Sequence, residues 1–288
     1  MKIGTIGYFA VLALYSCNAG SAEMPFLQTQ SSARTEAMGG AIAGMAGNSN
    51  SVFGNPAALS SLKGSELSFS HFEYYGGIRH ETVSAVSELA NGTALGLSLV
   101  YINNGEQDRR DIFGVRSGNF TPFQLVPTLS FSTAINKDIS FGANVKVPYE
   151  NIDDYSSAKV VFDLAAFLNV GEGFTAGINF QNLGLYENLP VNLKAGMGYF
   201  SASLSAGLDL NCKPGGPSAL GFGLEETVLA GFPLRAGIKY DTGEAFNLLN
   251  SLSFGFGVKI TQLSLDYAFK LREDLGNTHY VTAVVRFK

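Results

Sequence analysis

Apolar and polar residues alternate along most of the chain, from about residue 64 to the last residue. Between residues 252 and 260, Leu, Phe, Phe, Val and Ile occupy every second position, with Ser, Gly, Gly and Lys between them. Successive side chains of a β-strand point to opposite faces, so this segment predicts a strand with one apolar face. In a membrane-spanning barrel, apolar faces contact lipid and small or polar faces line the lumen. The pattern therefore predicts an all-β fold, a transmembrane antiparallel β-barrel.

Turn signals such as Asn91-Gly92 divide this region into about fourteen strands, an even number as in bacterial barrels. We expect strands at 65–75, 77–89, 93–104, 121–135, 139–150, 157–170, 173–183, 190–200, 202–211, 218–226, 228–241, 248–260, 262–272 and 278–287. The two faces are least distinct in 77–89 and 157–170. The connections should be short, and the longest, about 105–119, should be a solvated external loop because it is rich in charge.

Composition supports a membrane barrel. Only 15% of the 288 residues are charged, compared with roughly 25% in soluble proteins, and 12% are aromatic. No stretch beyond residue 22 has the roughly 18 consecutive apolar residues of a membrane helix. A soluble β-sandwich is the alternative. The net charge of −5 is spread along the chain without a basic patch, which argues against nucleic acid as a partner.

Residues 1–22 have the pattern of an export signal. A lysine near the start is followed by a short apolar run, and the small residues 20–22 precede a predicted cut before Glu23. Lipoprotein processing at Cys17 is the alternative. After removal of residues 1–22 only Cys212 is left, so no internal disulfide is expected. We expect the mature chain in the outer membrane, with membrane lipid as a partner.

Residues 23–63 differ in composition from the alternating region. From Ser32 to Leu59 the chain is rich in Gly, Ala, Ser and Asn, and its glycines disfavour a stable helix. Predicted strands place glycine on the lumen side, where it weakens a strand. These glycines are Gly96, Gly142, Gly177, Gly198, Gly207, Gly237 and Gly257. We interpret residues 23–63 as a small plug inside a barrel formed by residues 64–288; close approach of a ligand is the alternative explanation of the glycines.

The predicted lumen face also carries charge. Its charged residues are Lys146, Lys194, Arg235, Lys239, Lys259, Lys270 and Arg286, with Asp163, Asp209 and Asp266. A hydrated salt-bridge network that stiffens the barrel would explain them. The alternative is a basic path for an anionic headgroup, because the excess of positive charge suits a carboxylate or phosphate ligand. Glu225-Glu226 is interpreted as a solvated strand end.

The chain has no pattern for catalysis or for a cofactor. The three histidines, His71, His80 and His279, have no spacing that favours a nucleophile pair, and there is no Gly-x-Ser-x-Gly. The Cys and His residues lack the spacing of metal ligands. Gly39-Gly40 is not followed by the Lys-Ser/Thr of a nucleotide-binding loop. We therefore expect a protein that is not an enzyme and has no cofactor or metal.

Motifs at the start of the mature chain resemble those of the PorV/PorQ family of outer-membrane proteins, relatives of the FadL-type fatty-acid channels. That family has S-A-R-x-x-x-M-G-G-A followed by N-P-A-G-L. The matching residues here are Ser32, Ala33, Arg34, Met38, Gly39, Gly40, Ala41, Asn55, Pro56, Ala57, Ala58 and Leu59. Asn48-Ser49-Asn50 replaces an acidic pair of the family. We place the plug and gate at Arg34, Met38, Gly39, Gly40, Asn55, Pro56 and Ala57.

The closing hairpin also resembles that family, which ends in L-D-Y-A-F, then D-L-G-x-T-H-R, then R-F. Here these motifs are residues 265–269, 274–279 and 286–287. Tyr280 replaces the usual arginine, and Lys288 follows the terminal phenylalanine.

Three functions follow from the resemblance. FadL-type channels imply a barrel that binds or passes hydrophobic small molecules such as fatty acids. PorV itself implies an accessory of type IX protein secretion that binds cargo, a role expected to use long external loops, for which this chain leaves little length. A purely structural barrel is the third. The first uses the plug and lumen most directly, and we expect it.

Overall fold

The computed structural model describes residues 24–29, 32–45, 47–214, 216–243, 245–272 and 276–287. The predicted signal peptide, residues 1–22, lies outside them, as does Lys288. Within the described ranges, no helix is both long and apolar enough to span a membrane.

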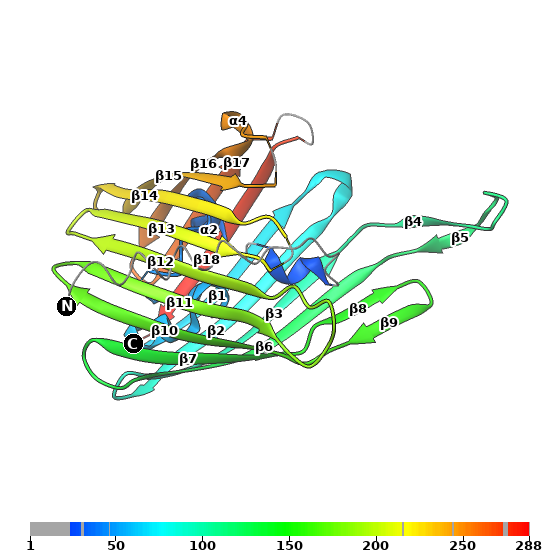
Figure 1. Cartoon of the computed structure of the whole chain (residues 1–288). Helices are drawn as coiled ribbons and strands as arrows, with labels where there is room; N and C mark the ends of the chain where they lie inside the picture. Colours follow the sequence, from blue (N-terminus) through cyan, green and yellow to red (C-terminus); the bar gives the residue numbers. More distant parts are fainter. Residues whose placement is uncertain are drawn as a thin grey trace.

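A closed antiparallel barrel forms most of the molecule (Figure 1). In the part described, fourteen of the sixteen strands in the main sheet make its wall, and β8 and β9 extend it. The wall strands are β1 (Ser65–Glu73), β2 (Arg79–Ala90), β3 (Thr93–Asn103), β6 (Phe123–Ala134), β7 (Ile139–Lys146), β10 (Val161–Gly171), β11 (Phe174–Leu183), β12 (Asn192–Phe200), β13 (Leu204–Cys212), β14 (Ala219–Leu229), β15 (Phe232–Asp241), β16 (Leu252–Ile260), β17 (Leu263–Lys270) and β18 (Thr278–Phe287). Pairing of β1 with β18 and of β3 with β6 closes the ring.

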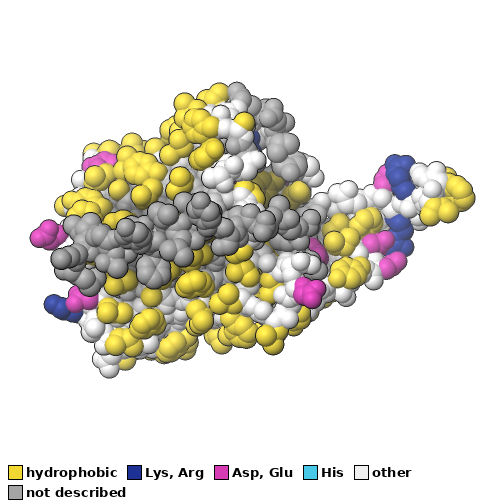
Figure 2. Space-filling model, in the orientation of Figure 1, with side chains coloured by type: hydrophobic (Ala, Val, Ile, Leu, Met, Phe, Trp, Pro, Cys, Tyr) yellow, Lys and Arg dark blue, Asp and Glu magenta, His cyan; other side chains and the backbone are white. Residues whose placement is uncertain are grey.

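The two faces of the wall differ as the alternation predicts. In β1, Leu67 and Phe69 are exposed on the outside, whereas Ser68 and Ser70 are buried on the inside. Figure 2 shows apolar side chains spread over the visible wall. An apolar outer face and a polar inner face are typical of a membrane-spanning barrel. The predicted fold class and strand number are therefore confirmed.

Several boundaries differ from the prediction. The strand expected at 139–150 ends at Lys146, because Pro148 has no N–H to continue the ladder. The strand expected at 248–260 begins instead with a short helix, α4 (Leu248–Ser251). The side chain of Asn247 caps it by accepting hydrogen bonds from the backbone N–H groups of Leu249 and Asn250. A short turn, η4 (Tyr75–Gly77), follows β1 where the prediction extended the strand.

The expectation of short external loops is wrong in two places. Residues predicted as a loop form a hairpin, β4 (Gln107–Arg110) and β5 (Arg116–Phe120), that projects well beyond the barrel (Figure 1). A second hairpin, β8 (Tyr149–Ile152) and β9 (Tyr155–Ala158), pairs with β6. Arg109 joins the two by an ion pair with Asp153.

The two ends of the barrel are unlike each other. One end carries tight turns such as that between β2 and β3, together with the start of β1 and the end of β18. The other end carries both hairpins and the longer connections. Bacterial barrels have short periplasmic turns and longer extracellular loops. We therefore call these the turn end and the outer mouth.

The N-terminal segment, residues 24–62, runs through the interior of the barrel (Figure 1). Its elements are η2 (Pro25–Gln28), α2 (Ala33–Ala37), α3 (Ser51–Gly54) and η3 (Pro56–Ser61). These short helices were not expected from the glycine content. Ser32 makes α2 feasible, because its hydroxyl accepts a hydrogen bond from the N–H of Thr35 at the helix start.

Candidate functional site

Glycines of the inner wall face the N-terminal segment at close range. A Cβ on Gly237 would overlap the backbone of Met38 and Gly39, and one on Gly177 would overlap that of Ala43. Of the seven glycines predicted to face the lumen, five have this kind of contact with the segment: Gly142, Gly177, Gly198, Gly207 and Gly237. A Cβ on Gly96 would instead meet the side chains of Ser130, Val86 and Val52 at 3.2 to 3.4 Å. The seventh predicted glycine, Gly257, instead faces the side chains of Asp266 and Arg235. Because those five glycines have no side chain, the backbone of the wall and the backbone of the N-terminal segment can pack directly against each other.

Polar wall side chains bind the backbone carbonyl and N–H groups of the segment. The amide nitrogens of Asn144 and Asn179 donate to the carbonyls of Val52 and Gly54 at 2.8 and 2.9 Å. On β13, Asp209 Oδ2 accepts hydrogen bonds from the N–H groups of Ile42 and Ala43 at 2.9 and 2.8 Å. Alternation predicted that Asp209 points inward, but its partner could not be predicted because it lies far away in sequence.

An ionic network fixes the first turn of α2 in the segment. The guanidinium of Arg34 donates two hydrogen bonds of 2.9 Å to Glu225 on β14. Glu225 also pairs with Arg235 at 2.5 Å, and Arg235 reaches Asp266 at 2.7 Å. The interpretation of Glu225 as a solvated strand end is therefore wrong, because it points inward and binds two arginines. Bidentate Arg–carboxylate pairs orient both groups.

A second ion pair joins α2 to β17. Lys270 Nζ lies 2.7 Å from Glu36 Oε1, and both side chains are buried. Burial by itself would raise the pKa of Glu36, but the Lys270 ammonium and its hydrogen bond lower that pKa below its ordinary value of 4.5. Ser253 adds a hydrogen bond of 2.6 Å to the carbonyl of Glu36. α2 is thus held on the neighbouring strands β16 and β17 by charge and hydrogen bonds.

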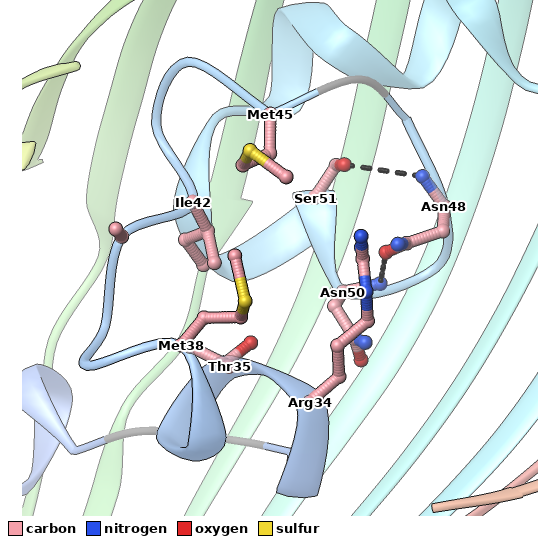
Figure 3. A pocket seen from close by; sticks show the side chains of 9 residues that line it. Arg34, Thr35, Met38, Ile42, Met45, Asn48, Asn50 and Ser51 are labelled. Atoms are coloured by element: carbon pink, nitrogen blue, oxygen red, sulfur yellow. Dashed lines mark hydrogen bonds between the residues drawn. The ribbon is translucent and has the colours of Figure 1, made fainter. Parts of the chain in front are cut away.

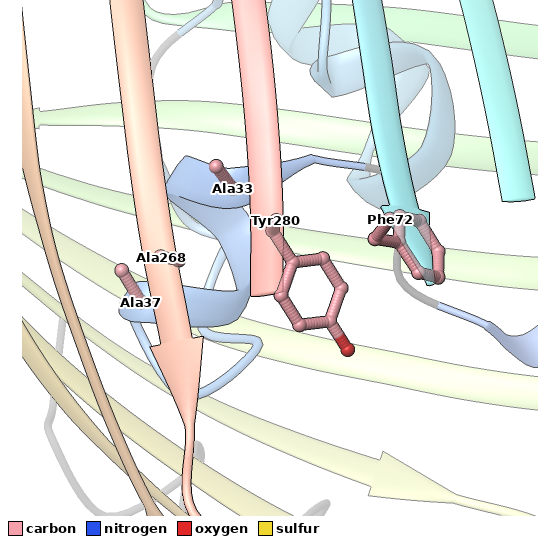
Figure 4. Close-up of a cluster of buried hydrophobic side chains, with 5 residues drawn as sticks. All are labelled: Ala33, Ala37, Phe72, Ala268 and Tyr280. Carbon is pink, nitrogen blue, oxygen red and sulfur yellow. The ribbon is translucent and has the colours of Figure 1, made fainter. Parts of the chain in front are cut away.

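Small side chains fit α2 against the wall (Figure 4). Ala33 and Ala37 of α2 and Ala268 of β17 belong to one buried cluster with the aromatic rings of Phe72 and Tyr280. The two ring centroids are 4.5 Å apart. The cluster gives the segment an apolar contact beside its ionic ones.

The predicted gate residues Asn55, Pro56 and Ala57 lie where the segment turns against β7 and β10. Asn55 is extended, as a following proline favours. Its side chain accepts a hydrogen bond from the N–H of Ala57 at 3.0 Å and donates to the carbonyls of Ala43 and Ala166 at 2.9 and 3.0 Å. One buried amide therefore connects two parts of the segment with the wall.

The remaining gate residues lie around the middle of the segment. Met38 ends α2, and Gly39 and Gly40 follow in the left-handed region, with φ of 62° and 78°. Figure 3 shows Met38, Arg34 and Met45 around a cavity inside the segment. Its volume is only about 10 Å³, so the segment packs tightly on itself.

Two pockets open at the outer mouth, on either side of η2. The larger, of about 440 Å³, we call the histidine pocket. It is lined by Pro25, Phe26, Thr29, Tyr74, Ile78, His80, Ile102, Asn104, Gln124, Glu150 and Arg272. His80 stacks on Phe72 with centroids 4.1 Å apart, and its Nε2 lies 3.2 Å from Thr29 Oγ1. Pro25, Phe26, Tyr74, Ile78 and Ile102 give the pocket an apolar and aromatic part, and its other six lining residues are polar, including Glu150 and Arg272.

The smaller, of about 60 Å³, we call the lysine pocket. It is lined by Leu27, Gln28, Thr29, Phe53, Lys146, Gln181, Asn192, Lys194, Asn211, Lys213, Ala219 and Lys239. Lys146 pairs with Asp163 at 2.8 Å, and Lys239 with Asp241 at 3.4 Å. For Lys194, no ion pair is formed within the described ranges. Positive charge therefore exceeds negative charge around this pocket.

The other predicted lumen charges lie outside the two pockets. Arg235 and Asp266 belong to the network around Glu225. Arg286 binds Glu66 at 2.8 Å, and Lys259 is exposed near the turn end. No group of three metal-binding side chains occurs among the described residues. A third pocket, of about 960 Å³, opens at the turn end and includes Ser60 and Ser140 among its lining residues.

Comparison with known proteins agrees with this architecture. The model of the family described as outer membrane protein transport protein (OMPP1/FadL/TodX) matches residues 12–170, more than half of the chain. No curated protein matches the sequence.

Solved structures share the fold at low sequence identity. The Ralstonia pickettii toluene transporter TbuX is 14% identical, with a TM-score of 0.70 over 91% of this chain and 100% of that chain. The Pseudomonas putida toluene transporter TodX is 12% identical, with a TM-score of 0.65 over 94% and 98%. A Pseudomonas aeruginosa FadL homologue is 13% identical, with a TM-score of 0.65 over 94% and 100%. The chain belongs to the family of outer membrane transport proteins that includes OmpP1, FadL and TodX.

Proposed function

We propose that this barrel takes up hydrophobic small molecules with an anionic end, such as fatty acids, through its outer mouth. The observation that carries the proposal is the pair of pockets there, one with a group of apolar and aromatic side chains in its lining and one rich in lysine. Thr29 lines both pockets, so a single ligand can contact the two environments. Ligand sites are commonly apolar cavities with a few placed polar groups.

The lysine pocket supports an anionic end. Lys146, Lys194 and Lys239 converge on it beside the apolar Leu27 and Phe53. An ammonium group binds a carboxylate by a charge-assisted hydrogen bond. An uncharged ligand such as toluene, named for two of the similar structures, would use none of these lysines.

We propose further that residues 23–63 are a plug that closes the lumen of the barrel formed by residues 64–288, after removal of residues 1–22 as a signal peptide. Support comes from the contacts of the N-terminal segment with the inner wall, from Arg34 at one end to Ala57 at the other. Passage of a ligand then requires that part of the segment move.

Binding of dodecanoate and dodecanol to the purified barrel tests the ligand class, because the two differ only at the headgroup. We expect dodecanoate to bind more tightly, and Lys194→Ala to weaken dodecanoate by about tenfold while leaving dodecanol unchanged. Lys137→Ala, which removes an exposed lysine at the turn end, is the control. Equal affinity for the two compounds in the wild-type protein would exclude a headgroup site.

The β4–β5 hairpin favours a second candidate, the PorV/PorQ-type role of binding secreted protein. Ile112 and Phe113 at its tip are 93% and 83% exposed. Figure 2 shows this apolar tip at the far end of the projecting hairpin. Exposed apolar side chains at the tip of a projecting hairpin are suited to contact with another protein.

Replacing the tip tests this candidate. Ile112→Ser with Phe113→Ser should abolish co-purification of a secreted chain, whereas Ile135→Ser, at an exposed position of the turn end, should not. A secreted chain that still co-purifies with the double variant would rule out the hairpin. Dodecanoate binding should be the same in the wild-type protein and in both variants, so the two candidates are tested separately.

A further inference from the structure

All the charge in the lining of the lysine pocket is positive. Its four lysines are Lys146, Lys194, Lys213 and Lys239, and no aspartate or glutamate is among the described residues that line it. Gathering like charges in a partly buried place is costly, because they repel one another and lose their water. Four ammonium groups around a pocket of about 60 Å³ therefore suit an anion that arrives with the ligand.

The lysines reach the pocket from different strands. Lys146 lies on β7, Lys194 on β12 and Lys239 on β15. On the two strands between β12 and β15, Lys194 is opposite Asn211, and Asn211 is opposite Ala219. These two side chains are short, so they leave room between Lys194 and Lys239. An anion in this pocket therefore meets ammonium groups on several sides rather than along one edge.

The lysines differ in how well the protein itself neutralises them. The Nζ of Lys146 lies 2.8 Å from Asp163, so its charge is matched. The Nζ of Lys239 lies 3.4 Å from Asp241, which is longer than the roughly 2.7–2.9 Å of a charge-assisted hydrogen bond. Within the described ranges, Lys194 forms no ion pair. Lys194 and Lys239 are therefore two ammonium groups that a ligand can engage.

Two amide groups of the pocket are already engaged. Gln181 Nε2 donates a hydrogen bond of 2.9 Å to the carbonyl of Phe53, and Asn192 Nδ2 donates one of 2.9 Å to Gln181 Oε1. These bonds hold β11 and β12 to the N-terminal segment. The ligand is therefore recognised mainly by the lysines, which makes the charge of its head group decisive.

The charge and the number of oxygens distinguish the possible head groups. A carboxylate has one negative charge and two oxygens. A phosphate monoester has roughly 1.5 to 2 negative charges at pH 7 and three strong acceptor oxygens. Two poorly neutralised ammonium groups on different strands therefore match a phosphate monoester more closely than a carboxylate.

We infer that the lysine pocket binds amphiphiles whose head group is a phosphate monoester, with Lys194 and Lys239 each donating to a phosphate oxygen. The alkyl chain lies against Leu27 and Phe53 and continues past Thr29 into the histidine pocket. This inference rests on the proposed function and names the head group that the same site prefers.

Four dodecyl compounds that differ only in the head group test the inference. Dodecyl phosphate, dodecyl sulfate, dodecanoate and dodecanol are bound to the purified barrel, each below its critical micelle concentration. We expect dodecyl phosphate to bind about tenfold more tightly than dodecanoate, because the second ammonium adds a charge-assisted hydrogen bond. Dodecyl sulfate is tetrahedral but has a single charge, so it should bind like dodecanoate.

The outcomes separate this inference from the proposed function. If dodecyl phosphate binds no more tightly than dodecanoate or dodecyl sulfate, the inference is wrong. The proposed function nevertheless stands in that case if dodecanoate binds more tightly than dodecanol. If all four compounds bind equally, both are wrong.

A substitution tests the role of the second lysine. Lys239→Met removes the ammonium group at similar side-chain length, and it should weaken dodecyl phosphate about tenfold more than dodecanoate. Lys137→Met, at an exposed position of the turn end, is the matched control and should keep the preference for phosphate. Heat-modifiable migration verifies folding of both variants. A preference for phosphate that persists in Lys239→Met would contradict the assignment of Lys239.

Inorganic phosphate distinguishes an amphiphile site from a site for free phosphate. It has the charge of the head group but no chain to contact the apolar residues of the two pockets. At equal concentration it should therefore leave most dodecyl phosphate bound. Displacement as complete as that by unlabelled dodecyl phosphate would show a free-phosphate site and overturn the inference.

Discussion

Gly237 shows at the scale of one residue how closely the N-terminal segment approaches the wall. The φ angle of Gly237 is not in the left-handed region, so its own backbone conformation does not require glycine. The requirement comes instead from the chain packed against it. That neighbour is the Met38–Gly39 backbone. Overpacking of a filled interior destabilises by about 1–3 kcal/mol.

Gly237→Leu should therefore lower the free energy of unfolding by about 1–3 kcal/mol, measured by urea titration in lipid vesicles. Gly216→Ala, where a Cβ would make an ordinary 3.6 Å contact with Lys213, should have little effect. Equal stability of Gly237→Leu and wild type would mean that the segment does not pack on this strand.

Glu36 makes the attachment of α2 dependent on pH. Its folded pKa is lowered, so the stabilisation is complete above the ordinary pKa of 4.5 and is lost as pH falls through the folded value. Glu36→Gln should cost about 1–3 kcal/mol near neutral pH. In urea titrations, the difference from wild type should shrink as the pH falls below 4.5. If the stability difference between Glu36→Gln and wild type does not change with pH, the charge of the Glu36 carboxylate does not contribute to the attachment of α2.

Side-chain direction could be predicted from sequence, but partners could not. Alternation placed Lys146, Arg235 and Asp266 on the inner face, because strand phase is a local property. The partner of Arg34 is 191 residues away in sequence, at Glu225. Local pattern has no information on such a pair, so the sequence predicts a solvated Glu225.

At the scale of elements, every wall strand was predicted within a few residues, because each has an apolar outer face. The two hairpins beyond the barrel were missed, since strands exposed on both sides carry no such alternation. The short helices of the N-terminal segment were also missed. They depend on packing inside the lumen and on single caps, such as that of Ser32, rather than on propensity.

The prediction at the scale of elements concerns the outer face of β16, which we expect to contact lipid. Phe256 points outward among other apolar side chains. Phe256→Arg should lower the free energy of unfolding in lipid vesicles by about 2–4 kcal/mol if it lies near the membrane centre. Phe256→Ala controls for the loss of the ring. If Phe256→Arg and Phe256→Ala lower the free energy of unfolding equally, this face does not contact lipid.

At the scale of the whole molecule, the interior is asymmetric. One wall, around Asp209, Glu225 and Lys270, holds the N-terminal segment by glycine contacts and ion pairs. The other wall, along β2, β3 and β6, holds it without ion pairs among the described residues: Val86 and Ala94 belong to one buried apolar cluster with Val52 and Leu59 of the segment. The segment lies between the pockets of the outer mouth and the pocket at the turn end.

The central claim is that the N-terminal segment closes the barrel, and single-channel recording in planar bilayers tests it most directly. Removal of residues 32–54 should leave a folded, heat-modifiable barrel whose conductance exceeds that of the full chain. Removal of residues 107–120, the β4–β5 hairpin outside the lumen, is the control and should leave conductance unchanged. A folded barrel that lacks residues 32–54 yet conducts no more than the full chain would contradict the claim.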